Sequence, residues 1–123
     1  MGTRPIEKEM WAGAIDPVGG EILAWLTRTM MYEGAIAASG LTGGIDVHTT
    51  VLPFILRGVK LLGIDSVMCP MERRRDAWWR LATDMKPANL KASTREIGLA
   101  GLPAAFATLV KGEARGRYVV RLY

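Results

Sequence analysis

The stretch "SGLTGG" (39–44) contains the residue types best suited to holding a ligand. It directly follows the short apolar run "AIAA" (35–38), which is typical of a buried strand. Glycine has no Cβ, so such a loop lets the backbone approach a ligand closely. Loops of this kind lie beside the cofactor in nucleotide-binding proteins. The sequence nevertheless contains no G-x-G-x-x-G motif to bind a pyrophosphate, so a complete site of that type is not present.

The other reactive side chains have no obvious catalytic partners. His48 is the single histidine, and its neighbour Asp46 is predicted to lie in a loop, so an ordinary surface histidine is favoured over a proton relay. Cys69 precedes Pro70 with no histidine nearby, which favours an inert thiol over a nucleophile. Cysteine, histidine and carboxylate residues nowhere have the spacing of metal ligands. We therefore assign no catalytic residue and expect no metal site.

The segment "ERRRDAWWR" (72–80) interleaves arginine with tryptophan, a combination that can bind phosphates and stack on bases. Helical spacing places Trp78 on an apolar stripe with Ala77, Leu81 and Met85. The arginines of the segment then spread around the exposed arc. A solvated helix face is therefore favoured over nucleic-acid binding.

The elements that position these residues alternate between strand and helix. The pattern predicts a strand over 11–16, a turn at Asp16-Pro17 and Gly19-Gly20, and a helix from 20 that stops near Gly34. Strands follow over 35–40 and 60–67, with Pro53 in the first turn of an intervening helix. Strand, helix and strand joined by tight glycine turns are typical of a right-handed parallel crossover. The turn at 16–20 is either a simple turn or a loop at the edge of a cofactor.

The remaining segments continue the α/β pattern. A helix is predicted from Pro70 at its N1 position, and another over 103–112 with Phe106, Leu109 and Val110 facing inward. The stretch 116–123 closes the chain as a strand. The fold class is therefore α/β with mostly parallel strands. Three parallel strands make a narrow sheet with open edges, and in a doubly wound fold they form half of a larger sheet.

Composition sets broad limits. A chain of 123 residues suits one domain, and 50% hydrophobic residues suggest strands buried on both faces or apolar surface that meets a partner. The formal charge of +4 is a modest excess that we interpret as a surface bias. The single cysteine fits a reducing cytosol. We see no leader and no apolar run of about 18 residues, so a soluble cytoplasmic protein is expected.

Four stretches carry a resemblance to a known family: "WAGAIDPVGGEILAWL", "AASGLTGG", "VLPFILRGVKLLGIDSVMCPMERR" and "GRYVVRLY". They closely resemble the C-terminal part of the zinc-free quinone oxidoreductase branch of the medium-chain dehydrogenase/reductase superfamily. The nearest group is the acryloyl-CoA reductase-like enzymes. The resemblance runs from about Arg4 to the end of the chain.

The resemblance implies an NADPH-dependent oxidoreductase that transfers hydride to an activated C=C bond of an enoyl thioester such as acryloyl-CoA, or to a quinone. Residues 1–86 would form the second half of a Rossmann-like cofactor-binding domain. Residues 87–123 would be the segment that in the family returns to the GroES-like catalytic domain. The barrel and the pyrophosphate-binding turn have no counterpart in this sequence, so we expect the isolated chain to be inactive.

The resemblance also implies a set of cofactor-binding residues at the nicotinamide end of NADPH. Gly40, Leu41, Ile55 and Ser66 match positions that contact the cofactor in the family. Gly40 would let the backbone approach the ring, Leu41 and Ile55 would offer apolar contact, and the Ser66 hydroxyl would bond a carboxamide.

The family also suggests partners. Its members dimerise by pairing the last Rossmann strand, so residues 60–67 are the expected homo-oligomer edge, and the arginines of 72–80 could meet the phosphates of a coenzyme A substrate. The alternative function is a non-catalytic, self-associating α/β module. A less favoured alternative is a basic nucleic-acid-binding domain, whose salt-dependent DNA affinity would vanish when Arg73, Arg74 and Arg80 become alanine.

Overall fold

The computed structural model describes residues 2 and 4–123. The chain divides into two compact units, which we call the N-terminal unit (1–69) and the C-terminal unit (70–123). The boundary between residues 86 and 87, which the family resemblance implies, stays a prediction.

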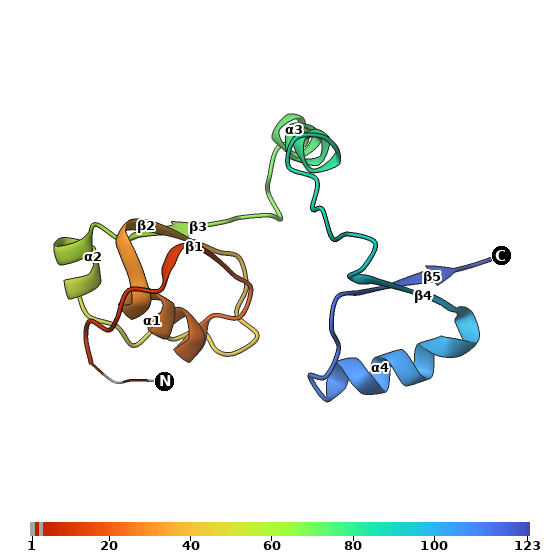
Figure 1. The fold of residues 1–123 in the computed structure, drawn as a ribbon, viewed down its shortest axis with the longest axis horizontal. Coiled ribbons are helices and arrows are strands. Elements are labelled where there is room, and N and C mark those ends of the chain that lie inside the picture. Colours follow the sequence, from red (N-terminus) through yellow and green to blue (C-terminus); the bar gives the residue numbers. More distant parts are fainter. Residues whose placement is uncertain (1, 3) are drawn as a thin grey trace. The chain divides into compact units, whose positions relative to one another are not determined.

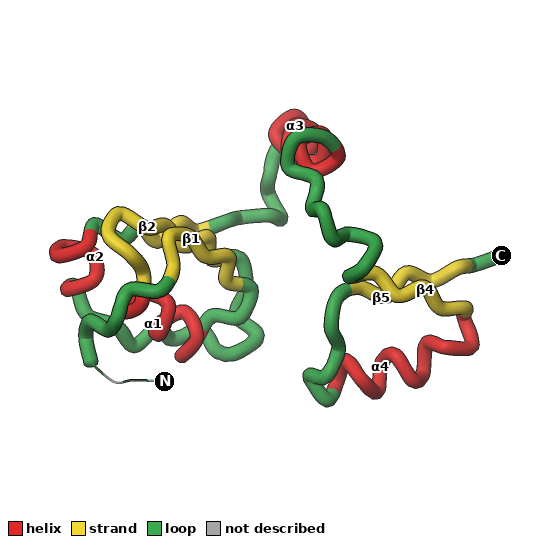
Figure 2. The backbone as a smooth tube through the Cα atoms, viewed as in Figure 1, coloured by secondary structure: helices red, strands yellow, loops and turns green. Residues whose placement is uncertain are grey.

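The N-terminal unit is a three-stranded parallel sheet with two helices (Figures 1 and 2). The strands lie in the order β1-β2-β3, and both pairs are parallel. The predicted parallel α/β arrangement is confirmed. The elements in chain order are β1 (Trp11–Asp16), α1 (Gly20–Thr29), β2 (Met30–Ala38), α2 (Leu52–Arg57) and β3 (Lys60–Gly63).

The core of this unit lies between α1 and one face of the sheet. Leu23 and Leu26 of α1 pack with Met30, Ile36 and Val59, and Ile36 in the central strand is fully buried. The opposite face carries the row Ile15, Ala37 and Leu62, whose members pair across the three strands. Ile15 is 80% exposed and Leu62 is 50% exposed. The unit therefore buries only one face of a sheet type that is normally covered on both.

The helix predicted to reach Gly34 ends at Thr29, so that prediction is wrong in its second half. Two threonine hydroxyls near its end donate hydrogen bonds to the preceding turn of the helix. The Thr27 hydroxyl donates to the carbonyl oxygen of Ala24, and the Thr29 hydroxyl donates to the carbonyl oxygen of Trp25. Met30 then takes an extended conformation with ψ of 144° and is fully buried in the core. Helical periodicity alone predicts that the helix continues through Met30. The burial of the Met30 side chain in the core instead favours the start of the strand at this residue.

Residues 31–34 form a bulge in β2. Trp11 pairs with Met30 and Gly13 pairs with Ala35. The register therefore advances by five residues in β2 over an advance of two residues in β1. Glu33 has the left-handed φ of 58°, and a Cβ at Gly34 would lie 3.0 Å from the Ala12 carbonyl oxygen. The glycine read as a helix stop is thus needed for close packing inside a bulged strand.

The C-terminal unit is a helix followed by a small βαβ arrangement. Its elements are α3 (Met71–Ala82), β4 (Thr94–Gly98), the 3₁₀ turn η1 (Leu99–Gly101), α4 (Leu102–Val110) and β5 (Arg117–Arg121). Strands β4 and β5 pair in parallel from Thr94 with Arg117 to Gly98 with Arg121. Within the described residues, no helix combines the length and apolar character needed to cross a membrane.

Several side chains expected to face inward in this unit are exposed. Phe106, Leu109 and Val110 on α4 are 57%, 52% and 88% exposed, because two strands offer too little surface to cover them. No residue of α3 is buried, so the stripe with Trp78 does not pack into a core. Pro70 occupies the N-cap position of α3 instead of N1.

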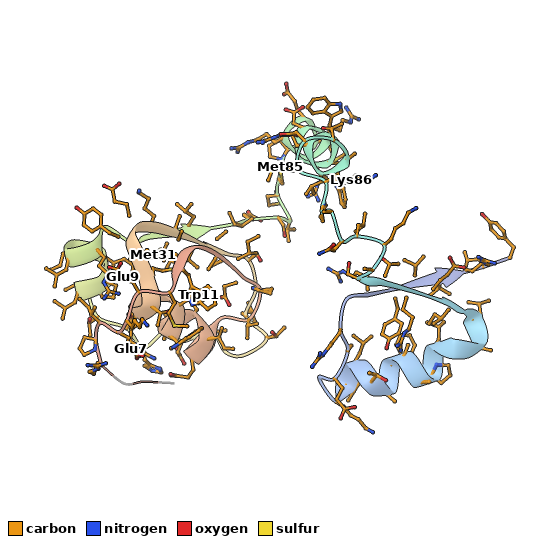
Figure 3. All side chains as sticks on the ribbon, in the orientation of Figure 1. Glu7, Glu9, Trp11, Met31, Met85 and Lys86 are labelled. Carbon is orange, nitrogen blue, oxygen red and sulfur yellow. The ribbon has the colours of Figure 1, made fainter. Side chains whose placement is uncertain are left out.

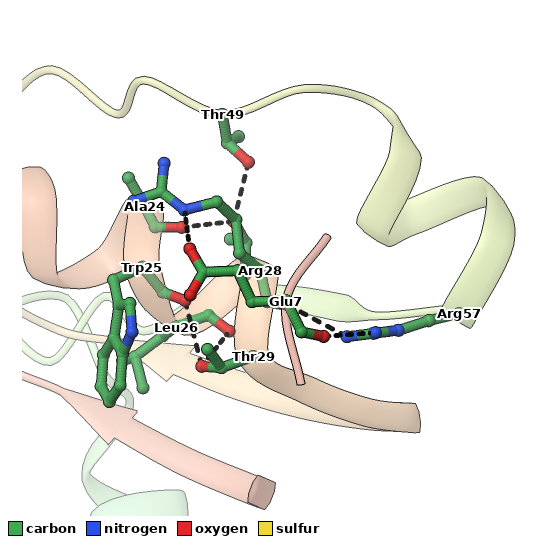
Figure 4. A network of polar contacts seen from close by, with 9 residues as sticks. Glu7, Ala24, Trp25, Leu26, Arg28, Thr29, Thr49 and Arg57 are labelled. Atoms are coloured by element: carbon green, nitrogen blue, oxygen red, sulfur yellow. Dashed lines mark hydrogen bonds and ion pairs between the residues drawn. The ribbon is translucent and has the colours of Figure 1, made fainter. Parts of the chain in front are cut away.

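Arg57 joins the separate segments at the amino ends of the strands in the N-terminal unit (Figure 4). Figure 3 labels Glu7 and Glu9 on the segment that leads into β1. The Nη1 of Arg57 donates to the carbonyl oxygens of Arg28 at 3.0 Å and Met30 at 3.2 Å, and its Nη2 donates to that of Glu7. Nε lies 3.3 Å from a carboxylate oxygen of Glu9. One guanidinium thereby holds α2 against the end of α1, the start of β2 and the segment leading into β1.

We expect Arg57→Met to destabilise the N-terminal unit by about 2–3 kcal/mol, because it leaves backbone carbonyls of a partly buried network without a cationic donor. Urea unfolding followed through the amide signals of β2 measures the loss. Arg80→Met is the matched control, since Arg80 forms an exposed ion pair with Asp84 and should cost under about 1 kcal/mol. Equal losses for the two variants would contradict the assigned role of Arg57.

Candidate functional site

The carboxyl ends of the three parallel strands of the N-terminal unit meet at one edge of the sheet. Asp16, Ala38 and Gly63 are paired neighbours there and are followed by loops at 17–19, 39–51 and 64–69. Ligands of open parallel α/β sheets bind outside the carboxyl ends of the strands. We call this region the strand-end edge and take it as the candidate site.

The first two loops of the strand-end edge interlock through their backbones. The Ser39 amide donates to the Asp16 carbonyl oxygen at 2.8 Å, and the Gly43 amide donates to that of Val18 at 2.7 Å. A Cβ added at Gly40 would lie 2.0 Å from the carbonyl oxygen of Pro17. Gly40 is therefore required for loop-to-loop packing, a constraint that differs from the expected approach of a ligand ring.

Asp16 sits beneath this loop pair. Its side chain is buried, and its two carboxylate oxygens accept hydrogen bonds from the amides of Val18 at 3.2 Å and Gly19 at 2.9 Å. The charge lies at the positive end of α1, where a carboxylate is favourable. Residues 16–20 thus form a hydrogen-bonded turn that borders the candidate site, and a contact of this turn with a cofactor stays a prediction.

Leu41 and Ser66 lie on loops that leave this same edge. Leu41 is 64% exposed and Ser66 is also exposed. The Ile64 amide donates to the Ala38 carbonyl oxygen at 2.9 Å, which holds the start of the third loop against β2. Asp65 Oδ1 accepts the amides of Val67 and Met68, each at 3.1 Å, and shapes the turn that carries Ser66.

Ile55 is not brought to the strand-end edge. It lies on α2, two residues before Arg57, whose guanidinium contacts the carbonyl oxygen of Met30 at the amino end of β2. Figure 1 shows α2 on the far side of the N-terminal unit from the stretch that leaves β3. The structure thus groups Gly40, Leu41 and Ser66 and leaves Ile55 apart, and the cofactor contact of each stays a prediction.

His48 is exposed, as expected, but a carboxylate does face it. Its Nδ1 lies 3.2 Å from Glu21 Oε1, and both side chains are well exposed to solvent. The partner is 27 positions earlier in the sequence, so inspection of neighbouring residues such as Asp46 does not find it. Among the described residues, no cluster of three His, Cys, Asp or Glu side chains could hold a metal ion.

A shallow hollow of about 540 Å³ belongs to the C-terminal unit. Its lining includes Ser93, Arg95, Thr108, Arg115 and Tyr118, and the Arg95 guanidinium lies 5.9 Å from the centre of the Tyr118 ring. The hollow is wide open and lies beside a two-stranded sheet. Its size alone gives no reason to prefer it to the strand-end edge as a site.

The strand-end edge combines apolar and polar groups. Leu41 and Ile64 present exposed apolar surface, while Ser66 offers a hydroxyl and the loops offer backbone groups. The carboxylates of Asp16 and Asp65 are engaged with backbone amides. The described residues of this edge thus place exposed apolar side chains beside polar side-chain and backbone groups.

Comparisons with known proteins give close relatives. No protein-family model matches the chain. It is 49% identical over 117 residues to the acrylyl-CoA reductase AcuI of Ruegeria pomeroyi, and the match covers 95% of this chain and 36% of that protein. It is 48% identical over 120 residues to YhfP of Bacillus subtilis, named as a quinone oxidoreductase, with 97% and 36% covered. The chain thus spans about a third of the length of these relatives.

Solved structures agree with the sequence matches. Escherichia coli K-12 YhdH with bound NADPH superposes with a TM-score of 0.83 at 45% identity, covering 99% of this chain and 38% of that one. Bacillus subtilis YhfP with bound NAD gives a TM-score of 0.82 at 48% identity, covering 97% and 36%. Over nearly its whole length the chain therefore matches about a third of proteins of the medium-chain dehydrogenase/reductase superfamily that are named quinone oxidoreductase and acrylyl-CoA reductase.

Proposed function

We propose that the chain supplies the nicotinamide-side half of an NADPH site in a reductase that transfers hydride to an activated C=C bond. The substrate would be an enoyl thioester such as acryloyl-CoA, or a quinone. The observation that carries the proposal is the match over 99% of the chain to a protein crystallised with NADPH. The names of the relatives support the two substrate classes.

The residues of this chain would bind and orient the cofactor. Leu41 would contact the ring, the Ser66 hydroxyl would bond its carboxamide, and the packed Gly40 would fix the loop that carries Leu41. A bound NADPH would supply the hydride. Because the chain spans about a third of its relatives, the pyrophosphate-binding turn and the proton donor belong to the remaining two thirds in this proposal. The chain alone is then inactive.

Further properties of the family extend the proposal. Independence of zinc and a homodimer formed through residues 60–67 are expected from the resemblance, and a cytoplasmic location is expected from the single cysteine. The dimer is supported by the place of β3 at the end of the strand order and by the exposure of Leu61 and Leu62, at 40% and 50%. An exposed apolar strand at a sheet edge is a template for pairing with a second chain.

A second candidate function is a non-catalytic module that folds by self-association. The uncovered sheet face, where Ile15 is 80% exposed, favours this alternative over nucleic-acid binding. The basic segment on α3 supports the nucleic-acid alternative less well. Although Trp78 and Trp79 are each 66% exposed, Arg80 is already paired with Asp84 at 3.0 Å.

Calorimetry with NADPH on the purified chain tests the proposed site. We expect saturable binding that weakens at least about tenfold in Leu41→Asp, because the new carboxylate would have to lose its water against the ring. Leu109→Asp is the control, since Leu109 is similarly exposed on α4 of the other unit. A folded wild-type chain that shows no saturable heat, or equal losses in both variants, would count against the proposal.

Light scattering tests the expected dimer edge. Leu62→Glu should dissociate the dimer about tenfold more readily, because it places a charge beside the same charge of the partner. Ile15→Glu is the matched control, since Ile15 lies in the same row on the opposite edge strand. If Ile15→Glu dissociates the dimer and Leu62→Glu does not, the interface lies at β1. A monomeric wild type would contradict the proposed dimer.

A further inference from the structure

We propose that Asp16 sets the ligand preference of the strand-end edge. Its buried carboxylate occupies the backbone amides of the turn before α1 that would otherwise bind phosphate, so the edge admits the uncharged end of a dinucleotide. The inference rests on the proposed function for the identity of the ligand. The exclusion of anions can be tested separately from it.

The turn between β1 and α1 has the ingredients of a phosphate-binding turn. It joins the carboxyl end of a parallel strand to the start of a ten-residue helix. Gly19 and Gly20 have successive left-handed φ angles of 74° and 55°, and Gly19 caps the helix without a side-chain bond. Backbone amides and the positive end of a helix together attract phosphate groups in such turns.

The Asp16 side chain takes the place that an anion would need. It is 1% exposed, and its oxygens accept the amides of Val18 and Gly19 from beneath the turn. These two amides are therefore already engaged by the carboxylate. A second negative group brought to this helix end would be repelled by a fixed charge in surroundings that screen it poorly.

The neighbouring loop adds carbonyl oxygens to the same turn. A Cβ at Gly19 would lie 2.7 Å from the carbonyl oxygen of Gly44 and 3.0 Å from that of Gly40. A Cβ at Gly20 would lie 2.4 Å from that of Gly43. Carbonyl oxygens carry partial negative charge, which further disfavours phosphate at this turn.

Titration of the ¹⁵N-labelled full chain with inorganic pyrophosphate tests the exclusion directly. In the wild type, the amide signals of Val18, Gly19 and Gly20 should show no saturable shift at millimolar pyrophosphate. In Asp16→Ser, which keeps a hydrogen-bond acceptor but loses the charge, they should shift saturably, with affinity raised at least about tenfold. Asp46→Ser is the control, because Asp46 is an exposed loop carboxylate whose loss changes the net charge equally.

Each outcome decides the inference. Saturable shifts of these amides in the wild type overturn it, and so does a folded Asp16→Ser that stays as unresponsive as the wild type. If Asp16→Ser does not fold, Asp16→Asn, which has nearly the same shape, replaces it in the same comparison. A wild type that rejects both pyrophosphate and NADPH, beside a variant that binds pyrophosphate, upholds the role of Asp16 and defeats the proposed function. If the wild type binds NADPH and its amides also respond to pyrophosphate, the role of Asp16 is refuted and the proposed function is upheld.

Discussion

Burial of only one face of the parallel sheet is the constraint on which the rest of the N-terminal unit depends. Parallel strands are stable when both faces are covered, and here α1 covers the face that contains Ile36. The other face keeps Ile15 and Leu62 in contact with water. The exposed apolar area, the open edges and the match to a third of longer relatives are consistent with one another. The same surface is what a larger sheet or a second copy would cover.

The two ends of this sheet use charge for different purposes. At the amino end, the Arg57 cation donates to three carbonyl oxygens and fixes how separate segments meet (Figure 4). At the carboxyl end, the Asp16 anion accepts two amides and fixes the loop next to the candidate site. Both charges are compensated mainly by backbone groups, and the Arg57 guanidinium also meets the Glu9 carboxylate at 3.3 Å. The first contributes to stability, and the second also influences which ligands fit.

Local pattern predicts the order and type of the elements well because short apolar runs and glycine turns determine them. The strand at 11–16 and the helix containing Pro53 have the expected places. The end of α1 is missed because the burial of Met30 is a tertiary contact that helical periodicity does not include. The same applies to Phe106, whose exposure depends on how few strands lie beside α4. For the candidate site, the loops could be named from sequence, but the Pro17 carbonyl facing Gly40 and the pairing of His48 with Glu21 required coordinates.

Because of the bulge at 31–34, the number of residues in β2 can change without moving the residues at the carboxyl ends of the strands. Pairing from Gly13 with Ala35 onward determines the register that brings Asp16 beside Ala38, and the extra residues lie outside that ladder. An insertion between Met31 and Glu33 would therefore leave the pairing from Gly13 with Ala35 onward unchanged. Homologues of different lengths could diverge at this point and still keep the same residues at the carboxyl ends of their strands.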